Sequence, residues 1–201
     1  MTDMGGVYCN GTGFGTRITD NVIYNVTAHS YGGWGLYTDE GSEGILFERN
    51  LVWNSDDGGF HQHYGTGNLI RNNIFAFNRR TGAVRMTTVR YGDMPGAYDF
   101  VNNIVYVKGA PLVGKLKSAG EYTLRGVWAG NLWWDAAGKP DLDGKDWEGW
   151  KKSGQEICGQ YADPMFVDPD KLDFRLKPGS PALALGFKPF DWSTAGVRPE
   201  K

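Results

Sequence analysis

Short apolar segments separated by Gly, Asn and Asp run along the chain as far as residue 135, and five of them share one pattern. Each begins with Asn and continues with two apolar residues and an aromatic or apolar one. The leading asparagines are Asn21, Asn50, Asn73, Asn103 and Asn131. Their spacings of 29, 23, 30 and 28 residues predict repeats that bury their apolar faces only by stacking.

Two further sets of strand-like segments recur in the same repeats. One set is expected at 6–10, 35–39, 59–63 and 83–87, and the other at 17–19, 45–47, 68–70 and 98–100. Three short strands per repeat predict an all-β fold, a right-handed parallel β-helix (solenoid) with about five coils and an irregular C-terminal cap. The recurring Asn predicts a ladder of side-chain amides at one corner, where Asn also tolerates the left-handed backbone of a sharp turn.

The chain is expected to form a single domain over 1–201. Residues 1–135 are coils, 136–160 an irregular polar insertion with a short helix within 147–156, and 161–201 closing strands and a tail. We expect the insertion to pack its tryptophans on the solenoid, and the tail, with a strand at 174–176, to close the C-terminal end. No cap precedes the first coil, which predicts either a fragment of a longer β-helix or a homo-oligomer formed end to end.

Composition narrows the classes of partner. With a formal net charge of -2, the chain has no basic surplus for nucleic acid, and no apolar run is as long as a membrane span. The sequence shows no signal peptide, so localisation stays open, with secretion or a periplasmic location expected for a longer parent protein.

The alternation of side chains along each strand, with a period of two residues, predicts which side chains point outward from the solenoid. In the first strand set the inward positions are expected to be Val7, Leu36, Phe60 and Val84, followed two residues later by Cys9, Thr38, Gln62 and Met86. The outward columns are then Tyr8–Tyr37–His61–Arg85 and Asn10–Asp39–His63–Thr87. Coils stack about 5 Å apart, so Asp39 and His63 should be neighbours.

These columns define a face with acids beside aromatic rings, which suits a sugar site, because carboxylates cleave glycosidic bonds and rings stack on sugars. Asp3 and Asp39 are the expected catalytic pair, and a separation of about 5 Å would suit a retaining hydrolase. The expected substrate-binding residues are Tyr8, Trp34, Tyr37, Glu40, Asp57, His61, His63, Tyr64 and Arg85. Arg90 is expected on the same face.

Other interpretations of these residues stay open. Asp56 and Asp57 precede two glycines, so their carboxylates can instead cap backbone amides in a turn, and Asp39 can do the same before Gly41. No cofactor is expected. A weaker alternative is a divalent metal ion held by His61, His63 and Asp39.

Segments 3–8, 31–42 and 57–65, together with 71–77 and the tail at 173–182, resemble the right-handed β-helix proteins of bacterial polysaccharide-degrading systems. The Asp-x-Gly-Gly-x-Tyr element at Asp3 and the Gly-x-Tyr-x-Asp element ending at Asp39 are similar to the acidic pair of glycoside hydrolase family 141. The resemblance implies hydrolysis of plant cell-wall glycans such as xylan and fucosylated pectin, with Asp3 and Asp39 as the pair. Enzymes of that family are much longer than this chain.

Two functions follow as hypotheses, both with a polysaccharide or oligosaccharide as partner. One is a glycoside hydrolase that uses paired carboxylates on the outer face. The alternative is a carbohydrate-binding β-helix module without catalysis, or a piece of a larger enzyme, which the short chain favours.

Overall fold

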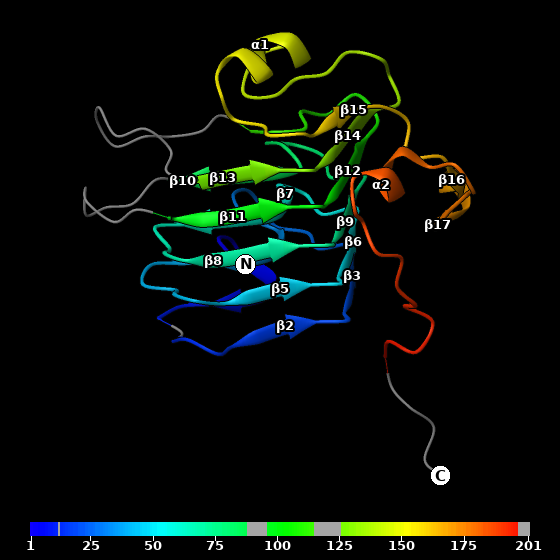
Figure 1. The fold of residues 1–201 in the computed structure, drawn as a ribbon. Coiled ribbons are helices and arrows are strands. Elements are labelled where there is room, and N and C mark those ends of the chain that lie inside the picture. Colours follow the sequence, from blue (N-terminus) through cyan, green and yellow to red (C-terminus); the bar gives the residue numbers. More distant parts are fainter. Residues whose placement is uncertain (12, 88–95, 115–125, 197–201) are drawn as a thin grey trace.

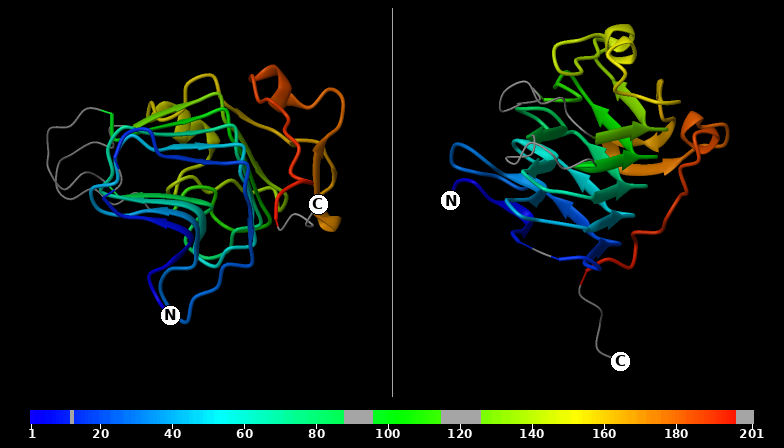
Figure 2. Two further views of the ribbon diagram at one scale, coloured as in Figure 1. Left: turned by 90° about the horizontal axis from the view of Figure 1, so that it is seen from below. Right: turned by 60° about the vertical axis from the view of Figure 1, so that its left-hand side comes forward.

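The computed structural model describes residues 1–11, 13–87, 96–114 and 126–196 of the chain. It is a parallel β-solenoid of about five turns with very little helix, which confirms the expected fold class (Figure 1). Seen along its axis, the chain winds around three flat sides, each of which is one parallel sheet (Figure 2).

Each of the first four turns contributes one strand to each sheet, as the three strand sets predicted. The first sheet contains β1 (Gly5–Cys9), β4 (Trp34–Thr38), β7 (Gly58–His63) and β10 (Val84–Thr87). The second contains β2 (Arg17–Thr19), β5 (Leu46–Glu48), β8 (Asn68–Arg71), β11 (Tyr98–Val101) and β13 (Gly126–Ala129). The third contains β3 (Val22–Tyr24), β6 (Leu51–Trp53), β9 (Ile74–Ala76), β12 (Ile104–Val107), β14 (Leu132–Asp135) and β15 (Gln160–Tyr161).

The interior is a continuous apolar column. The expected inward residues Leu36, Phe60 and Val84 are fully buried and belong to one core cluster. Aromatic rings continue the column from coil to coil, with Phe60 next to Phe75 and Phe75 stacked on Phe100 at 5.9 Å between ring centroids. Each coil buries its apolar side chains only against its neighbours, so a single coil is not stable until the coils stack.

The asparagine ladder is present in the predicted order. The Nδ2 groups of Asn21, Asn50, Asn73 and Asn103 donate to the Oδ1 of the next asparagine at 2.9, 2.9, 3.0 and 3.2 Å, ending on Asn131. Their backbone amides donate to the same oxygens. Each ladder position therefore satisfies both a side chain and a buried backbone group, which a buried corner requires.

The left-handed backbone at this corner lies one residue earlier than expected. The ladder asparagines have ordinary φ values, and the residues before them have φ between 53° and 64°. These residues are Asp20, Arg49, Asn72, Asn102 and Gly130. The expectation was wrong because the ladder side chain must point inward along the stack, so the preceding residue makes the turn.

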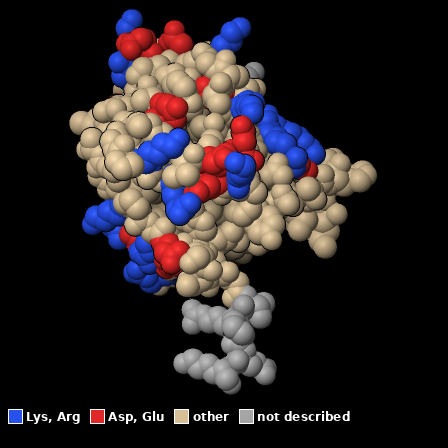
Figure 3. All heavy atoms as spheres, turned by 90° about the vertical axis from the view of Figure 1, so that its right-hand side faces the viewer, with Lys and Arg blue, Asp and Glu red and all other residues tan. Residues whose placement is uncertain are grey.

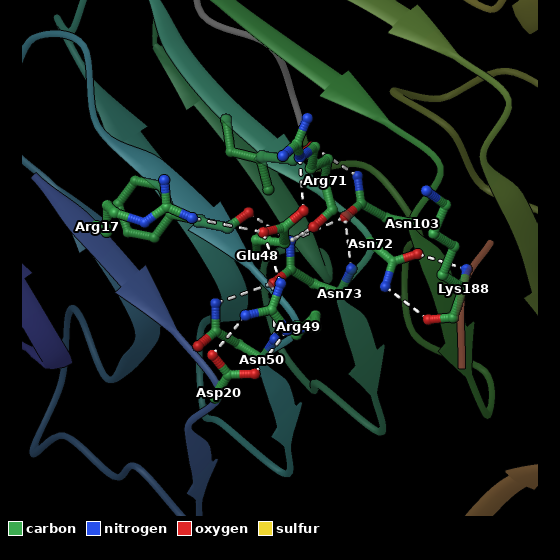
Figure 4. A network of polar contacts seen from close by, with 12 residues as sticks. Arg17, Asp20, Glu48, Arg49, Asn50, Arg71, Asn72, Asn73, Asn103 and Lys188 are labelled. Carbon is green, nitrogen blue, oxygen red and sulfur yellow. Dashed lines mark hydrogen bonds and ion pairs between the residues drawn. The ribbon is translucent and has the colours of Figure 1, made fainter. Parts of the chain in front are cut away.

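Polar side chains at the same corner bind one another across the coils (Figure 4). The Arg49 guanidinium contacts Asp20 at 2.6 Å and Glu48 at 2.7 Å, and Arg71 donates to Glu48 at 2.7 Å. These pairs are partly exposed, so each contributes about 1 kcal/mol or less. They partly offset the strain of an arginine at φ 54°.

The C-terminal end of the solenoid is covered by the insertion rather than by the tail. Within the insertion, α1 (Trp147–Lys152) is capped by Asp146 and buries Trp150 against Trp128 and Trp133, as the predicted helix required. Glu156 then ends the asparagine ladder. Its carboxylate accepts from Asn131 Nδ2 at 3.2 Å and from Trp133 Nε1 at 3.0 Å.

The tail packs on the side of the solenoid, against the outer surface of the third sheet, and so differs from the expected end closure (Figure 1). Figure 3 shows the surface on that side, where acidic and basic side chains lie next to one another among uncharged residues. It contains the antiparallel pair β16 (Phe166–Asp168) and β17 (Asp173–Leu176), the 3-10 turn η1 (Pro169–Lys171) and α2 (Pro181–Ala184). Phe174 is fully buried there, against Trp53 and Phe77. The outward residues of this sheet are apolar, so they need a cover that the coils alone do not supply.

Replacing a central ladder residue should destabilise the protein strongly. Asn73→Ala removes an amide that donates to Asn103 and accepts from Asn50, leaving buried polar groups unpaired. We expect a loss of about 2–4 kcal/mol in the free energy of unfolding, measured by chemical denaturation. Asn10→Ala, at an exposed amide with an ordinary backbone conformation, is the control and should cost less than half as much; equal losses would contradict the role of the ladder.

Glu156 should make stability depend on pH. Burial raises the pKa of Glu156 to about 7 from 4.5, against the opposing effect of its hydrogen-bond donors. A raised pKa in the folded state means that the contribution of Glu156 to stability is greatest below pH 4.5 and is lost as pH rises to about 7, by up to about 3 kcal/mol.

The check is the free energy of unfolding measured between pH 4.5 and 8. Glu156→Gln should flatten this part of the curve, because glutamine does not ionise. The control Glu148→Gln, on the exposed side of α1, should leave the wild-type slope intact. A Glu156→Gln protein with the wild-type slope would contradict the assignment.

Candidate functional site

The outward columns of the first sheet have the predicted register. Tyr8 pairs with Tyr37, Tyr37 with His61, and His61 with Arg85. In the second column His63 pairs with Thr87, and Asp39 follows β4 directly. The alternation of the sequence therefore brings side chains from four coils onto one face.

Four of the expected substrate-binding residues are buried, namely Trp34, Tyr37, His61 and, as described below, Asp57. The expectation that the three ring side chains are exposed is therefore wrong. Trp34 and His61 have 0% exposure and Tyr37 has 1%. The physical reason is that rings in successive coils cover one another, with the Trp34 and His61 centroids only 4.3 Å apart. Trp34 fits because Gly5 and Gly58 lie beside it in the neighbouring strands.

Asp39 is the centre of the accessible part of this face. Its Oδ2 accepts from the Tyr8 hydroxyl at 2.5 Å, and its Oδ1 lies 2.7 Å from Nδ1 of His63 and 2.8 Å from the amide of Glu40. Burial opposes ionisation of Asp39, but the hydrogen bonds from Tyr8, His63 and the Glu40 amide outweigh it and hold the pKa of Asp39 below its ordinary value. Asp39 is thus a partly buried, ionised and oriented carboxylate.

The surroundings of Asp39 combine rings with an open edge. Tyr8 is 48% exposed and packs edge-on against Tyr37, with 5.0 Å between centroids. On the other side, His63 packs on the half-buried Tyr64 ring at 4.1 Å. Glu40 is exposed at the end of the same strand. Exposed phenol and imidazole rings around a carboxylate offer both stacking and polar contacts to a sugar.

Asp3, the other expected catalytic residue, is connected to this group through Tyr37. The Tyr37 hydroxyl donates to Asp3 Oδ1 at 3.2 Å, and the exposed Asp3 lies at φ 52° in the turn before β1. Burial and the nearby negative charges of Asp39 and Asp3 raise the pKa of Tyr37, which keeps the phenol protonated as a donor. Two carboxylates, each bonded to a tyrosine hydroxyl, therefore lie on this face.

Asp56 and Asp57 have structural contacts, as the turn interpretation proposed. Asp57 is buried and accepts from the amide of Gly32 at 2.6 Å, and burial raises the pKa of Asp57. Asp56 accepts from the amide of Ala28 and binds Arg79 and Arg80. Asp57 therefore supports the loop before β4 and does not face a substrate directly.

Arg79 and Arg80 were missed by the sequence analysis, although a signal for them exists. They follow Asp56 by 23 and 24 residues, and the ladder step from Asn50 to Asn73 is also 23 residues. One coil spacing therefore places the arginines directly next to Asp56.

The contacts of His61 bear on the alternative that His61, His63 and Asp39 bind a divalent metal ion. His61 directs Nδ1 to the carbonyl oxygen of Arg85 at 3.1 Å, and burial lowers the pKa of His61 to about 3. His61 is therefore neutral at physiological pH, with its proton on Nδ1. Within the residues that the structure describes, no group of three His, Cys, Asp or Glu side chains has metal-binding geometry.

Arg85 lies at the far end of the column from Tyr8. Its guanidinium lies 5.3 Å from the ring centre of Trp34 and 5.8 Å from that of Tyr31. These contacts hold the arginine by cation–π attraction, and no acid among the described residues forms an ion pair with it. Arg90, which the sequence placed nearby, falls outside the described residues.

The stacked coils and the polar outer column define a parallel β-helix protein with a carboxylate-centred surface site. Residues 3–105 match the family described as "Right handed beta helix region", about half of the chain, and the chain belongs to this family. The family is common among polysaccharide-active proteins. No curated protein and no solved structure matches the chain. Among the described residues, no helix is long and apolar enough to span a membrane.

Removing the Tyr8 hydroxyl should raise the pKa of Asp39. Tyr8→Phe keeps the ring but deletes the donor to Oδ2, so ionised Asp39 loses a hydrogen bond. Titration of the Asp39 carboxyl carbon by NMR should show its pKa moving up toward the ordinary value. In the control Tyr24→Phe, on the third sheet, the pKa of Asp39 should not change. An unchanged Asp39 pKa in Tyr8→Phe would show that the hydrogen bond from Tyr8 to Asp39 is absent in solution.

Proposed function

We propose that this protein is a polysaccharide-active β-helix protein that hydrolyses glycosidic bonds at Asp39 and Asp3. The single observation that carries the proposal is the state of Asp39: an ionised carboxylate, oriented by Tyr8, His63 and the Glu40 amide, at the open edge of an aromatic face. A family common among polysaccharide-active proteins supports the substrate class.

In the proposed reaction, the bond between the anomeric carbon and the glycosidic oxygen breaks. One carboxylic acid protonates the leaving oxygen. The other carboxylate either removes a proton from the water that attacks the anomeric carbon, or attacks that carbon itself and forms a glycosyl ester that water then hydrolyses. Asp39 suits the second role because its hydrogen bonds favour the charged form. Asp3 is the candidate for the acid role, and Tyr37 fixes its position.

Tyr8, Tyr64 and His63 would position the sugar in this reaction. Their rings flank Asp39, and Tyr8 is substantially exposed. A buried layer beneath these residues would hold them in place, and it consists of Trp34, Tyr37 and His61. The substrate we propose is a plant cell-wall glycan such as xylan or pectin, on the strength of the motif resemblance around Asp3 and Asp39.

A second candidate is a carbohydrate-binding module without catalysis. The observation that favours it is that both carboxylates already accept hydrogen bonds from tyrosine hydroxyls, which leaves fewer free oxygen positions for chemistry. In that case Asp39 and Tyr8 would bind sugar hydroxyls, and no bond would break.

Replacing Asp39 should abolish hydrolysis. We expect Asp39→Asn to lower the rate of reducing-sugar release from a panel of xylans and pectins by about 100-fold or more, because the amide neither attacks nor accepts a proton. The matched control is Asp99→Asn, at an exposed position of β11 in the second sheet, which should keep the wild-type rate.

The same samples decide between the two candidates. Equal rates in wild type and Asp39→Asn would remove Asp39 from the mechanism. Retarded migration of the wild type in polysaccharide-containing gels, with no product from any substrate, would favour the binding module. Loss of that retardation in Tyr8→Ala would then place the binding surface on this face.

A further inference from the structure

A hollow of about 330 Å³ continues the outer face of the first sheet beyond Arg85. Arg80 and Arg85 line it on one side, and Pro111, Val113 and Asp141 line it on the other. Val113 bridges Val84 and Leu142, so the hollow lies where the next coils extend this sheet. Arg85 is two coils from Asp39, or about 10 Å along the axis, so one extended ligand can reach both.

The charged side chains around the hollow differ in whether they already have a hydrogen-bond or ion-pair partner. Arg80 is already bound to Asp56 and to the carbonyl oxygen of Ser30. The Asp141 carboxylate accepts from the amide of Gly144 at 2.8 Å, which makes it part of a turn. Asp57 is close enough for its charge to interact with Arg85, but its carboxylate is buried on the amide of Gly32.

Arg85 is therefore the cation with unused donors. Within the described residues, its guanidinium contacts the rings of Trp34 and Tyr31 and forms no ion pair. The ring contacts hold the planar group by its face, and no described residue forms an ion pair at its N–H edge. Such a fork matches the two oxygens of a carboxylate, or those of a sulfate, better than it matches a single hydroxyl.

The layer behind Arg85 also has unused polar atoms. Among the described residues, the indole nitrogen of Trp34 and Nε2 of His61 are buried without hydrogen-bond partners. His61 is fully buried, and its other nitrogen contacts the Arg85 carbonyl oxygen. Both unpaired atoms are fully buried, so they belong to the layer that supports the arginine and not to the surface that a ligand would contact.

We propose that the hollow at Arg85 is a subsite for a sugar residue that carries an anionic group, with the Arg85 guanidinium binding that group. This inference rests on the proposed function, because it places the acidic sugar of a polysaccharide chain two coils from Asp39. Pro111 and Val113 supply an apolar wall for the ring of that sugar. The ligand class is thus an acidic oligosaccharide, either a uronate or a sulfated sugar.

The experiment compares three probes by isothermal titration with the wild-type protein: a galacturonate hexamer, its fully methyl-esterified form and a sulfated galactose hexamer. The acid should bind at least tenfold more tightly than the ester, and the advantage should shrink when salt is raised from about 0.05 M to 0.5 M. Tighter binding of the sulfated probe than of the acid would identify the sulfate as the preferred anion.

Variants then test the assigned residue. Arg85→Gln should weaken binding of the acid by about tenfold or more while leaving binding of the ester within twofold. Arg85→Lys keeps the positive charge but loses the two parallel N–H donors of the guanidinium. Its affinity for the acid should lie between those of the wild type and Arg85→Gln. Arg17→Gln, an exposed arginine on the second sheet, is the matched control and should bind like the wild type.

Two outcomes would overturn the inference, and they are distinguishable. Equal binding of acid and ester by the wild type would refute the anionic subsite and leave the proposed function standing. No binding of any of the three probes would count against both. The wild-type comparison alone decides the first point, so the test does not depend on how well the Arg85 variants fold.

Discussion

The fold depends on the asparagine ladder, because it is the interaction that fixes how each coil sits on the next. A parallel strand pair by itself can slip by one residue, which would move every side chain to the opposite face. Asn50, Asn73 and Asn103 each bond to the side chain and the backbone of neighbouring coils at a buried corner. A slip would leave these groups unpaired in the interior, so the ladder sets the register from which both the apolar core and the outer columns follow.

The candidate site is a consequence of that register. Once the coils are fixed, Tyr8, Tyr37, His61 and Arg85 must form one column, and Asp39 must lie beside His63. The middle of this face is buried under packed rings, and polar side chains are accessible on either side of it. Rings pack on rings at Trp34, Tyr37 and His61, while Asp39 is left accessible toward one end and Arg85 toward the other. The buried rings thereby convert a row of surface residues into two polar positions held at a set distance.

The ends and sides of the solenoid are completed by less regular segments. Glu156 takes the place of a sixth asparagine and closes the ladder with a carboxylate that burial makes hard to ionise. On the third sheet, the tail covers outward apolar residues. Asn72 binds its backbone at Lys188 (Figure 4), and Asn102 binds it at Leu185. Both devices use the corner geometry of the coils, so they too depend on the ladder.

The sequence by itself determined the coil repeat, the ladder, the inward residues and the neighbours Asp39 and His63, because a spacing near one coil and a period of two encode register directly. Only the tertiary structure decided what lies over each outward residue. Alternation gives the direction of a side chain from its sheet, but the cover over Trp34, Tyr37 and His61 comes from rings in other coils. The role of Glu156 and the lateral position of the tail were equally hidden, because irregular segments carry no periodicity that ties them to one surface.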